Sequence, residues 1–182
     1  MDMTEEDIEE NIEEPLGDDD LRRYLPDALI LKYSKLARYK SIDELLPGQM
    51  NYCILLYEDS PNKGHWVCVS KYDNTVEFFD SYGGAPDTQL NWNAEIINQK
   101  LNQKPFLTNL FDSSTYDIIY NPIDYQGDHD DINTCGRHCV FRILNLIQKG
   151  KTLKKYYDMM KMLKKKTGAT FDDIVSFFIN ED

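Results

Sequence analysis

The sequence lacks the features of a secreted or membrane-spanning protein. Only four of its 182 residues are cysteine, and they show no paired spacing of the kind found in disulfide scaffolds. The amino terminus has no charged-then-apolar signal, and no apolar run approaches the length needed to cross a bilayer. We therefore expect a soluble intracellular protein that keeps its thiols reduced and contacts no membrane.

Lysine and arginine are absent from the first 20 positions, which hold 11 of the 32 acidic residues. The rest of the chain carries 21 acidic against 20 basic residues, so the net charge of −12 belongs mainly to this segment. Because the segment has few apolar residues to bury, we expect residues 1–20 to form a disordered acidic leader. Three roles stay open for it: a solubilising tail, a pro-segment or an arm that binds a partner. Residues 21–182 are long enough for a single domain with its own core.

Three runs in the middle of the chain predict an antiparallel meander: residues 52–57, 65–72 and 75–82. The last two runs are separated only by Asp73-Asn74, which predicts a two-residue hairpin turn. In that register His65 and Asp80 are diagonal neighbours on one face, and a slip of one residue would place them on opposite faces. The short turn therefore predicts a carboxylate positioned to orient an imidazole.

Helical patterns flank these strands. Residues 21–46 have apolar residues at helical spacing and predict helices and loops. Further helices are expected over residues 90–101, 135–147, 153–163 and 171–178, with one more strand over residues 116–120. The predicted fold class is α+β, with a central, mainly antiparallel sheet and flanking helices.

Cys135 lies at the start of the helix expected over residues 135–147. Asn133 or Thr134 can serve as its N-cap, and Gly150 can end it. A thiol in the first turn of a helix lies at the positive end of the helix dipole, which favours the thiolate. The sequence therefore predicts a reactive cysteine at the amino terminus of a buried helix.

The chain offers each group that thiol acyl transfer requires. Cys135 would attack a carbonyl carbon, His65 would take the thiol proton and return it to the leaving amine, and Asp80 would hold the imidazole tautomer. Gln126 would donate from its side-chain amide to the oxyanion, together with backbone N–H groups at the helix start. Taken alone, a histidine in a strand or a cysteine in a helix is more often a core residue.

Four short motifs occur in order along the chain: Gly64-His65-Trp66, Phe79-Asp80-Ser81, Gln126 and Thr134-Cys135-Gly136. This order resembles the clan of the adenovirus maturation protease and the SUMO-specific proteases, whereas papain-type enzymes run Cys, His, Asn. The His-Trp pair together with Cys-Gly-Arg-His-Cys is most similar to the capsid maturation proteases of virophages, polinton-like elements and other large DNA viruses. The resemblance covers residues 50–147.

The resemblance implies a cysteine endopeptidase that cleaves viral capsid or core precursors after glycine or another small residue during virion maturation. Gly64, Trp66 and Gly136 would line a narrow substrate cleft that rejects larger side chains. The enzyme would act as a monomer in the host cytoplasm or viral factory and would be packaged in the virion. No cofactor is expected, but a DNA or peptide activator stays open because the adenovirus enzyme uses DNA.

One spacing departs from the pattern of the clan. Gln126 lies nine positions before Cys135, which is longer than the clan usually has. Residues 127–131 must therefore bulge if Gln126 is to reach the oxyanion. The alternative donors are Asn133 or backbone groups alone.

Two other functions stay open. A deconjugating protease that removes a ubiquitin-like modifier would use the same chemistry with a different exosite. The other is a non-enzymatic module stabilised by zinc, because Cys135, His138 and Cys139 share one helix face. His129 lies nearby in the sequence and could be a fourth ligand. The lysine-rich segment 151–166 could bind nucleic acid, or it could be an ordinary solvated face.

Overall fold

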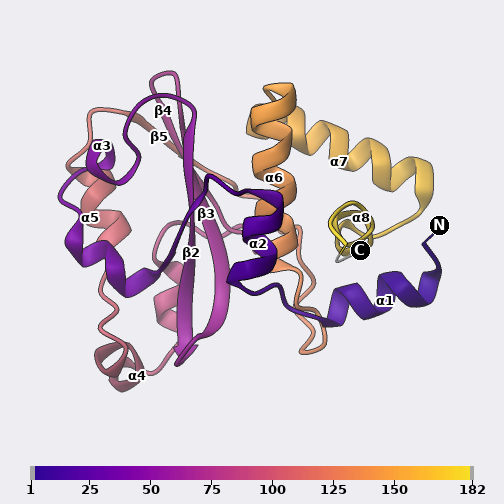
Figure 1. Ribbon diagram of the computed structural model, residues 1–182, viewed down its shortest axis with the longest axis horizontal. Coiled ribbons are helices and arrows are strands. Elements are labelled where there is room, and N and C mark those ends of the chain that lie inside the picture. Colours follow the sequence, from indigo (N-terminus) through magenta and orange to yellow (C-terminus); the bar gives the residue numbers. More distant parts are fainter. Residues whose placement is uncertain (1–2, 181–182) are drawn as a thin grey trace. The chain divides into compact units, whose positions relative to one another are not determined.

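The computed structural model describes residues 3–180, and residues 1, 2, 181 and 182 lie outside the described residues (Figure 1). The described chain divides into two compact units. Ala28–Pro122 form the sheet unit, and residues 3–27 together with 123–180 form the helical unit. We expected one domain over residues 21–182. The leader and the C-terminal segment belong to one unit and the sheet to the other, and the expected domain bounds stay a prediction.

The sheet has five strands in the order β1-β2-β3-β4-β5. Their bounds are β1 Leu29–Lys32, β2 Asn51–Ser60, β3 Lys63–Tyr72, β4 Thr75–Phe79 and β5 Asp117–Tyr120. The pairs β2–β3 and β3–β4 are antiparallel, which confirms the predicted meander. β1 runs parallel to β2, and β5 runs parallel to β4, so the sheet is mixed at its edges. The α+β fold class is confirmed.

The helix expected near residue 30 is wrong, because Leu29–Lys32 form the edge strand β1. Leu29 pairs with Cys53 and Lys32 pairs with Leu56. A short apolar run fits a buried strand as well as one helical turn, and the edge of β2 offers it a ladder of hydrogen bonds. The chain turns helical only afterwards, in the 3-10 helix η1 (Tyr33–Arg38).

One face of the sheet packs against short helices of the same unit. Besides η1 these are α3 (Ile42–Leu45) and α5 (Phe106–Asp112), and Figure 1 shows α3 and α5 on the same side of the strands. The core on this face is built from alternate strand residues and inward-facing helix residues, among them Tyr33, Leu36, Ile42, Leu45, Leu46, Leu55, Val67, Val69, Val76, Phe78, Leu107 and Leu110. Because side chains alternate along β3, His65 lies on the same face as Val67 and Val69, near one end of the strand.

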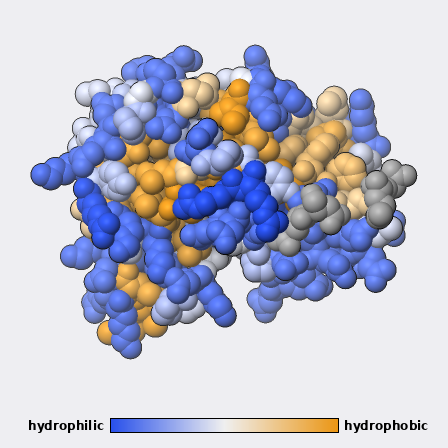
Figure 2. All heavy atoms as spheres, in the orientation of Figure 1, coloured by the Kyte–Doolittle hydropathy of each residue, from blue (hydrophilic) through white to orange (hydrophobic). Residues whose placement is uncertain are grey.

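The helix expected over residues 90–101 is interrupted. It consists of a 3-10 helix, η2 (Thr88–Trp92), and α4 (Glu95–Lys100), with Ala94 in an extended conformation between them. Figure 2 shows the surface of this face of the molecule as mostly hydrophilic, with hydrophobic side chains around α4, where Ile96 is exposed. The apolar periodicity therefore does not bury this segment as one continuous helix.

The helical unit contains the longer helices. They are α1 (Glu5–Glu13), α2 (Asp18–Tyr24), α6 (Cys135–Lys149), α7 (Leu153–Thr167) and α8 (Phe171–Phe178) (Figure 1). The predicted helices at the C-terminal end are confirmed. Gly150 ends α6 with φ 59°, a left-handed conformation that glycine adopts at little cost. Thr170 caps α8, and its side chain accepts from the Asp173 N–H.

The acidic leader is ordered over its described residues, contrary to our expectation of disorder. Thr4 and Asp7 form a capping box that starts α1. The carbonyl of Ile12 accepts from the Asn133 N–H at 2.8 Å, and the carbonyl of Glu13 accepts from the Asn133 side chain at 2.8 Å. These contacts use main-chain oxygens and leave the carboxylates in solvent. A count of acidic side chains could not reveal them.

Arg137 fastens the leader to α6. Its side chain is fully buried and donates to the carbonyls of Ile179 and Glu14 and to the side chain of Asn11. A buried guanidinium needs acceptors for its N–H groups, and here two of them come from the leader. The leader is therefore part of the packing of the helical unit.

Candidate active site

His65 and Asp80 form a buried hydrogen bond in the sheet unit. The Nε2 atom of His65 lies 2.8 Å from Oδ1 of Asp80, and the side chains are 8% and 3% exposed. Tyr72 pairs with Thr75 across the turn between β3 and β4, as the short turn predicted. The predicted pairing of imidazole and carboxylate is therefore confirmed.

Asp80 is held in place by backbone contacts. Its Oδ1 atom also accepts from the N–H of Tyr82 at 2.9 Å. Its main-chain carbonyl accepts from the buried side chain of Asn121 at 2.9 Å. An ionised carboxylate only accepts hydrogen bonds, so Nε2 of His65 carries a hydrogen and Nδ1 carries the lone pair of the neutral ring. The tautomer leaves Nδ1 as the nitrogen that can accept a proton.

Tyr82 stacks on the imidazole, a contact that the sequence analysis did not assign a function. The two ring centroids are 4.7 Å apart, and the planes meet at 21°. Trp92 packs against Tyr82, with the two ring centroids 5.2 Å apart, and Trp92 is 62% exposed. The hairpin register was the available signal, because it placed Tyr82 opposite His65. The stack restricts rotation of the imidazole about the bond that carries it.

Cys135 is the first residue of α6 in the helical unit and is 7% exposed. Thr134 occupies the N-cap position, but its side chain makes no cap hydrogen bond. Its hydroxyl donates instead to Oδ1 of Asp172 at 2.6 Å. The first turn of α6 also contains no acidic residue. The N–H groups of a helix start without a side-chain cap favour a negative charge, whether a thiolate or an oxyanion.

Gln126 reaches the start of α6 through a folded loop. Its side-chain Nε2 donates to the carbonyl of Ile132 at 3.3 Å, and the N–H of Ile132 bonds back to the carbonyl of His129 at 3.0 Å. The residues between Gln126 and Ile132 therefore loop out, and the oxyanion role of Gln126 stays a prediction. Asn133, the alternative donor, uses its side chain to bind the leader. Of the two side-chain candidates, Gln126 is the one that the loop holds next to the residues preceding Cys135.

Asp172 was not identified from the sequence. Its buried carboxylate accepts from Thr134, from Nε2 of His138 at 2.9 Å and from the N–H of Gly127 at 2.9 Å. Burial raises the pKa of Asp172, but the hydrogen bonds and charge of His138 and the bonds from Thr134 and Gly127 outweigh it and hold that pKa below its ordinary value. In the sequence this residue is only one of two acidic residues in the first turn of α8.

The zinc alternative requires His138 to converge with cysteines. His138 is instead bonded to Asp172, and among residues 3–180 no group of three or more His, Cys, Asp or Glu side chains is placed to hold a metal. All four cysteines are free thiols and are buried. Over the same described range, no helix combines the length and hydropathy needed to cross a membrane.

The three residues expected to line a substrate cleft have different surroundings. Trp66 is buried, and alternation along β3 places it on the face opposite His65. A Cβ at Gly64 would lie 1.8 Å from the carbonyl oxygen of Tyr57, so the approach of β2 alone requires glycine there. Gly136 is buried in the first turn of α6. The cleft role of these residues stays a prediction.

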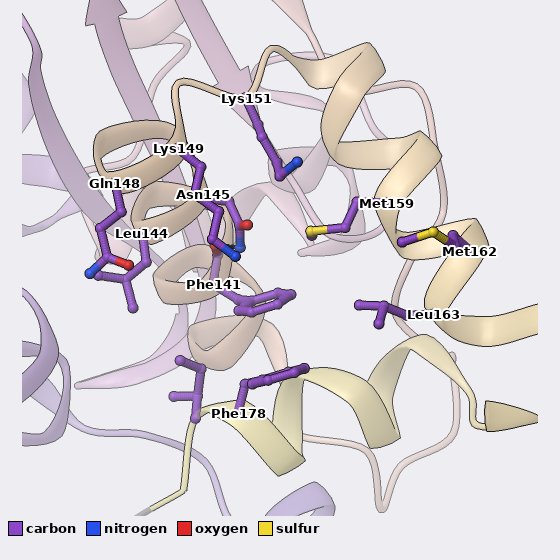
Figure 3. Close-up of a pocket in the computed structure, with 11 residues that line it drawn as sticks. Phe141, Leu144, Asn145, Gln148, Lys149, Lys151, Met159, Met162, Leu163 and Phe178 are labelled. Carbon is purple, nitrogen blue, oxygen red and sulfur yellow. Dashed lines mark hydrogen bonds between the residues drawn. The ribbon is translucent and has the colours of Figure 1, made fainter. Parts of the chain in front are cut away.

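An apolar pocket of about 480 Å³ lies along the C-terminal half of α6 in the helical unit. Figure 3 shows the rings of Phe141 from α6 and Phe178 from α8 facing each other, with Met159 and Leu163 of α7 pointing toward them. The two rings stack with centroids 5.2 Å apart. Cys135 is at the opposite end of α6, so we assign this pocket no part in the chemistry.

No family model matches the chain. The uncharacterized protein V9 of Sputnik virophage is 41% identical over an alignment of 138 residues, and the match covers 73% of this chain and 77% of that protein. The chain belongs to the family of Sputnik virophage V9. The link to virophages that the motifs predicted is thereby confirmed.

Two solved structures are similar to this chain. The crystal structure of the ASFV pS273R protease matches with a TM-score of 0.46 and 14% identity, over 93% of this chain. Its Se-Met form matches with a TM-score of 0.46 and 16% identity, over 94% of this chain. The chain spans 64% and 65% of the lengths of those two proteins. The chemistry of this chain therefore has to be argued from its own residues.

Proposed function

We propose that this protein is a cysteine endopeptidase in which Cys135 is the nucleophile, His65 the general base and Asp80 the residue that orients His65. The observation that carries the proposal is the buried hydrogen bond of 2.8 Å between His65 and Asp80. A general base needs its tautomer fixed, and the carboxylate of Asp80 can fix it for His65. Cys135 at the uncapped start of α6 supplies the matching thiol.

The proposed reaction uses these groups in two steps. The thiol proton of Cys135 passes to Nδ1 of His65, and the sulfur forms a bond to the peptide carbonyl carbon. The carbonyl oxygen becomes an oxyanion, for which the first-turn N–H groups of α6 and the Gln126 amide are the donors. The C–N bond then breaks, and the leaving amine takes the proton from His65. Water, deprotonated by His65, hydrolyses the thioester and restores the thiol.

We propose viral structural precursors as substrates, cleaved after glycine or another small residue in infected cells and in assembling particles. Membership of a virophage family and the order of the His, Asp, Gln and Cys motifs support this substrate class. Selection for glycine would come from steric rejection of larger side chains, which discriminates more strongly than an added apolar contact. We further propose that the lysine-rich helix α7 brings nucleic acid to the enzyme, since all its lysines are exposed.

The test compares the purified wild type with Cys135→Ala and His65→Ala on a library of Gly-Gly-X peptides. We expect cleavage after the small residue by the wild type only, with both variants reduced by at least about 10³-fold, since members of a catalytic unit fail together. Cleavage that persists in Cys135→Ala would refute the assignment. Ubiquitin-like proteins with C-terminal electrophiles serve as a second probe. Reaction with these probes alone, without peptide cleavage, would assign the enzyme to deconjugation.

A further inference from the structure

One carboxylate in the helical unit connects the two segments that carry the proposed nucleophile and oxyanion donors. Oδ1 of Asp172 accepts from the Thr134 hydroxyl at 2.6 Å and from Nε2 of His138 at 2.9 Å. Oδ2 accepts from the N–H of Gly127 at 2.9 Å. Thr134 directly precedes Cys135, His138 lies in the first turn of α6, and Gly127 follows Gln126. All three contacts lie inside the helical unit.

We infer that Asp172 is a positioning residue that aligns the Gln126 amide with the first-turn N–H groups of α6, so that both can bind one oxyanion. This inference rests on the proposed protease function. The two sources of hydrogen bonds come from a loop and from a helix, and only a shared anchor keeps their directions constant. Asp172 is that anchor because it bonds to both. In this inference Asp172 acts only through Gly127, Thr134 and His138 and takes no step of the reaction itself.

The alternative explanation for Asp172 is helix capping, and the structure assigns capping to its neighbours. The Thr170 hydroxyl accepts from the Asp173 N–H at 3.0 Å, and the Asp173 carboxylate accepts from the Thr170 N–H at 2.7 Å. The start of α8 is therefore already closed by a capping box. Asp172, one residue earlier and buried, directs its carboxylate to other segments. Asp173 therefore caps α8, and Asp172 contacts the other segments.

The hydrogen bond to Thr134 also explains why α6 begins without a side-chain cap. A threonine at the N-cap normally accepts from an N–H of the first turn. Here its hydroxyl is directed to Asp172, and no cap bond forms. The N–H groups in the first turn of α6 therefore receive no side-chain cap and can bind a negative charge that develops there. The side chain of His138 has no other hydrogen bond, because its buried Nδ1 lacks a partner among the described residues.

The main chain at Gly127, in the loop that follows Gln126, lies close to the carboxylate of Asp172. A Cβ at Gly127 would lie 3.3 Å from Oδ2 of Asp172 and 2.6 Å from Cδ1 of Ile132. The glycine lets the main chain approach the carboxylate and donate its N–H. All three partners are donors, so the network requires Asp172 to be ionised. An amide in its place would present one NH₂ group to at least one of those donors.

The experiment compares Asp172→Asn with the matched control Asp173→Asn, using peptide cleavage and amide hydrogen exchange. In Asp172→Asn the carbonyl can still accept from Thr134 and His138, but the NH₂ group faces the Gly127 N–H. We expect kcat to fall about 10- to 100-fold at unchanged KM, approaching the loss of one oxyanion donor. Asp173→Asn weakens the cap of α8 and should keep kcat within about twofold, because capping changes stability rather than alignment.

Equal kcat in the wild type and Asp172→Asn, or equal losses in the two variants, would overturn the inference while leaving the protease assignment intact. Hydrogen exchange gives a readout that needs no activity. The Gly127 amide should be protected in the wild type and in Asp173→Asn, and should lose protection in Asp172→Asn. A wild type that cleaves no peptide but shows this pattern would reject the protease function and retain the tie between loop and helix.

Thr134 supplies a second test if Asp172→Asn does not fold. Thr134→Val has nearly the same shape and lacks only the hydroxyl that donates to Asp172. Thr134→Ser keeps that hydroxyl and should restore most of the kcat that the valine variant loses. Equal kcat for the valine and serine variants would contradict the inference.

Discussion

His65 and Asp80 share a hydrogen bond of 2.8 Å because the turn between β3 and β4 is only two residues long. The turn fixes the register of the strands, and the register places both side chains on one face at the end of the core. The proposed catalytic pairing is thus set by local turn chemistry together with alternation. It is the part of the site that depends least on the rest of the fold.

Replacing Asp80 by alanine should lower kcat by about 10²- to 10⁴-fold, because an imidazole in the wrong tautomer cannot take the thiol proton. KM should change little, since Asp80 does not contact the substrate in the proposed mechanism. Steady-state kinetics on a cleaved peptide measure both constants. Asp59→Ala, an exposed acidic residue next to the turn between β2 and β3, is the matched control and should behave as the wild type. A KM effect alone would contradict the orienting role.

Tyr82 should matter for the ring it presents and not for its hydroxyl. We expect Tyr82→Ala to lower kcat about three- to tenfold, as an aromatic contact contributes about 0.5–1.5 kcal/mol. Tyr82→Phe keeps the stack of 4.7 Å on His65 and should remain within about twofold of the wild type. Equal activity of the alanine and phenylalanine variants would show that the stack does not hold the imidazole in a productive position.

Hairpin register, the helix at Cys135 and the α+β class could be predicted because each depends on local signals. A two-residue turn, a polar residue before an apolar helical stripe and a terminal glycine lie within a few positions of one another. Strand β1 could not be predicted, since a short apolar run acquires its conformation from the neighbouring strand. Asp172 could not either, because its partners at positions 127, 134 and 138 are distant in sequence.

The order of the leader was missed for a related reason. Composition counts the carboxylates of residues 1–20, but the contacts that hold the leader are made by carbonyl oxygens and by Arg137. Main-chain acceptors are the same in every sequence. Their use depends on a buried donor elsewhere, and nothing in the leader itself indicates that donor.

Removing residues 1–14 should therefore destabilise the protein and should not activate it. Arg137 and Asn133 would lose acceptors, and an unsatisfied hydrogen bond to a buried charged group costs about 1.5–3 kcal/mol. We expect a lower midpoint in urea unfolding and lower peptidase activity. Arg137→Ala should reproduce the loss of stability, and Arg23→Ala, at an exposed position, should not. An increase in activity on removal would instead support the role of a pro-segment.

The pH dependence of stability should reveal Asp172. Its pKa in the folded protein lies below the ordinary value of 3.8, so its ionised form stabilises the native state. That contribution is fully present above the unfolded pKa and is lost as pH falls through the lower folded pKa. The difference in unfolding free energy between the wild type and Asp172→Asn should be constant above about pH 5 and should shrink below about pH 4. Asp131→Asn, at an exposed position, should show no such change.

Cys135 should be the thiol that reacts first with an alkylating reagent. Burial raises the pKa of Cys53 well above its ordinary value, and Cys68 and Cys139 are also almost completely buried. Cys135 lies at the first turn of α6, where the helix dipole favours the thiolate. Iodoacetamide at neutral pH should label one thiol per native molecule, measured by intact mass, and Cys135→Ser should abolish that labelling. Cys139→Ser is the control because it lies on the same helix and should leave the labelling unchanged. Labelling of several cysteines at similar rates would show that the start of α6 does not activate its thiol.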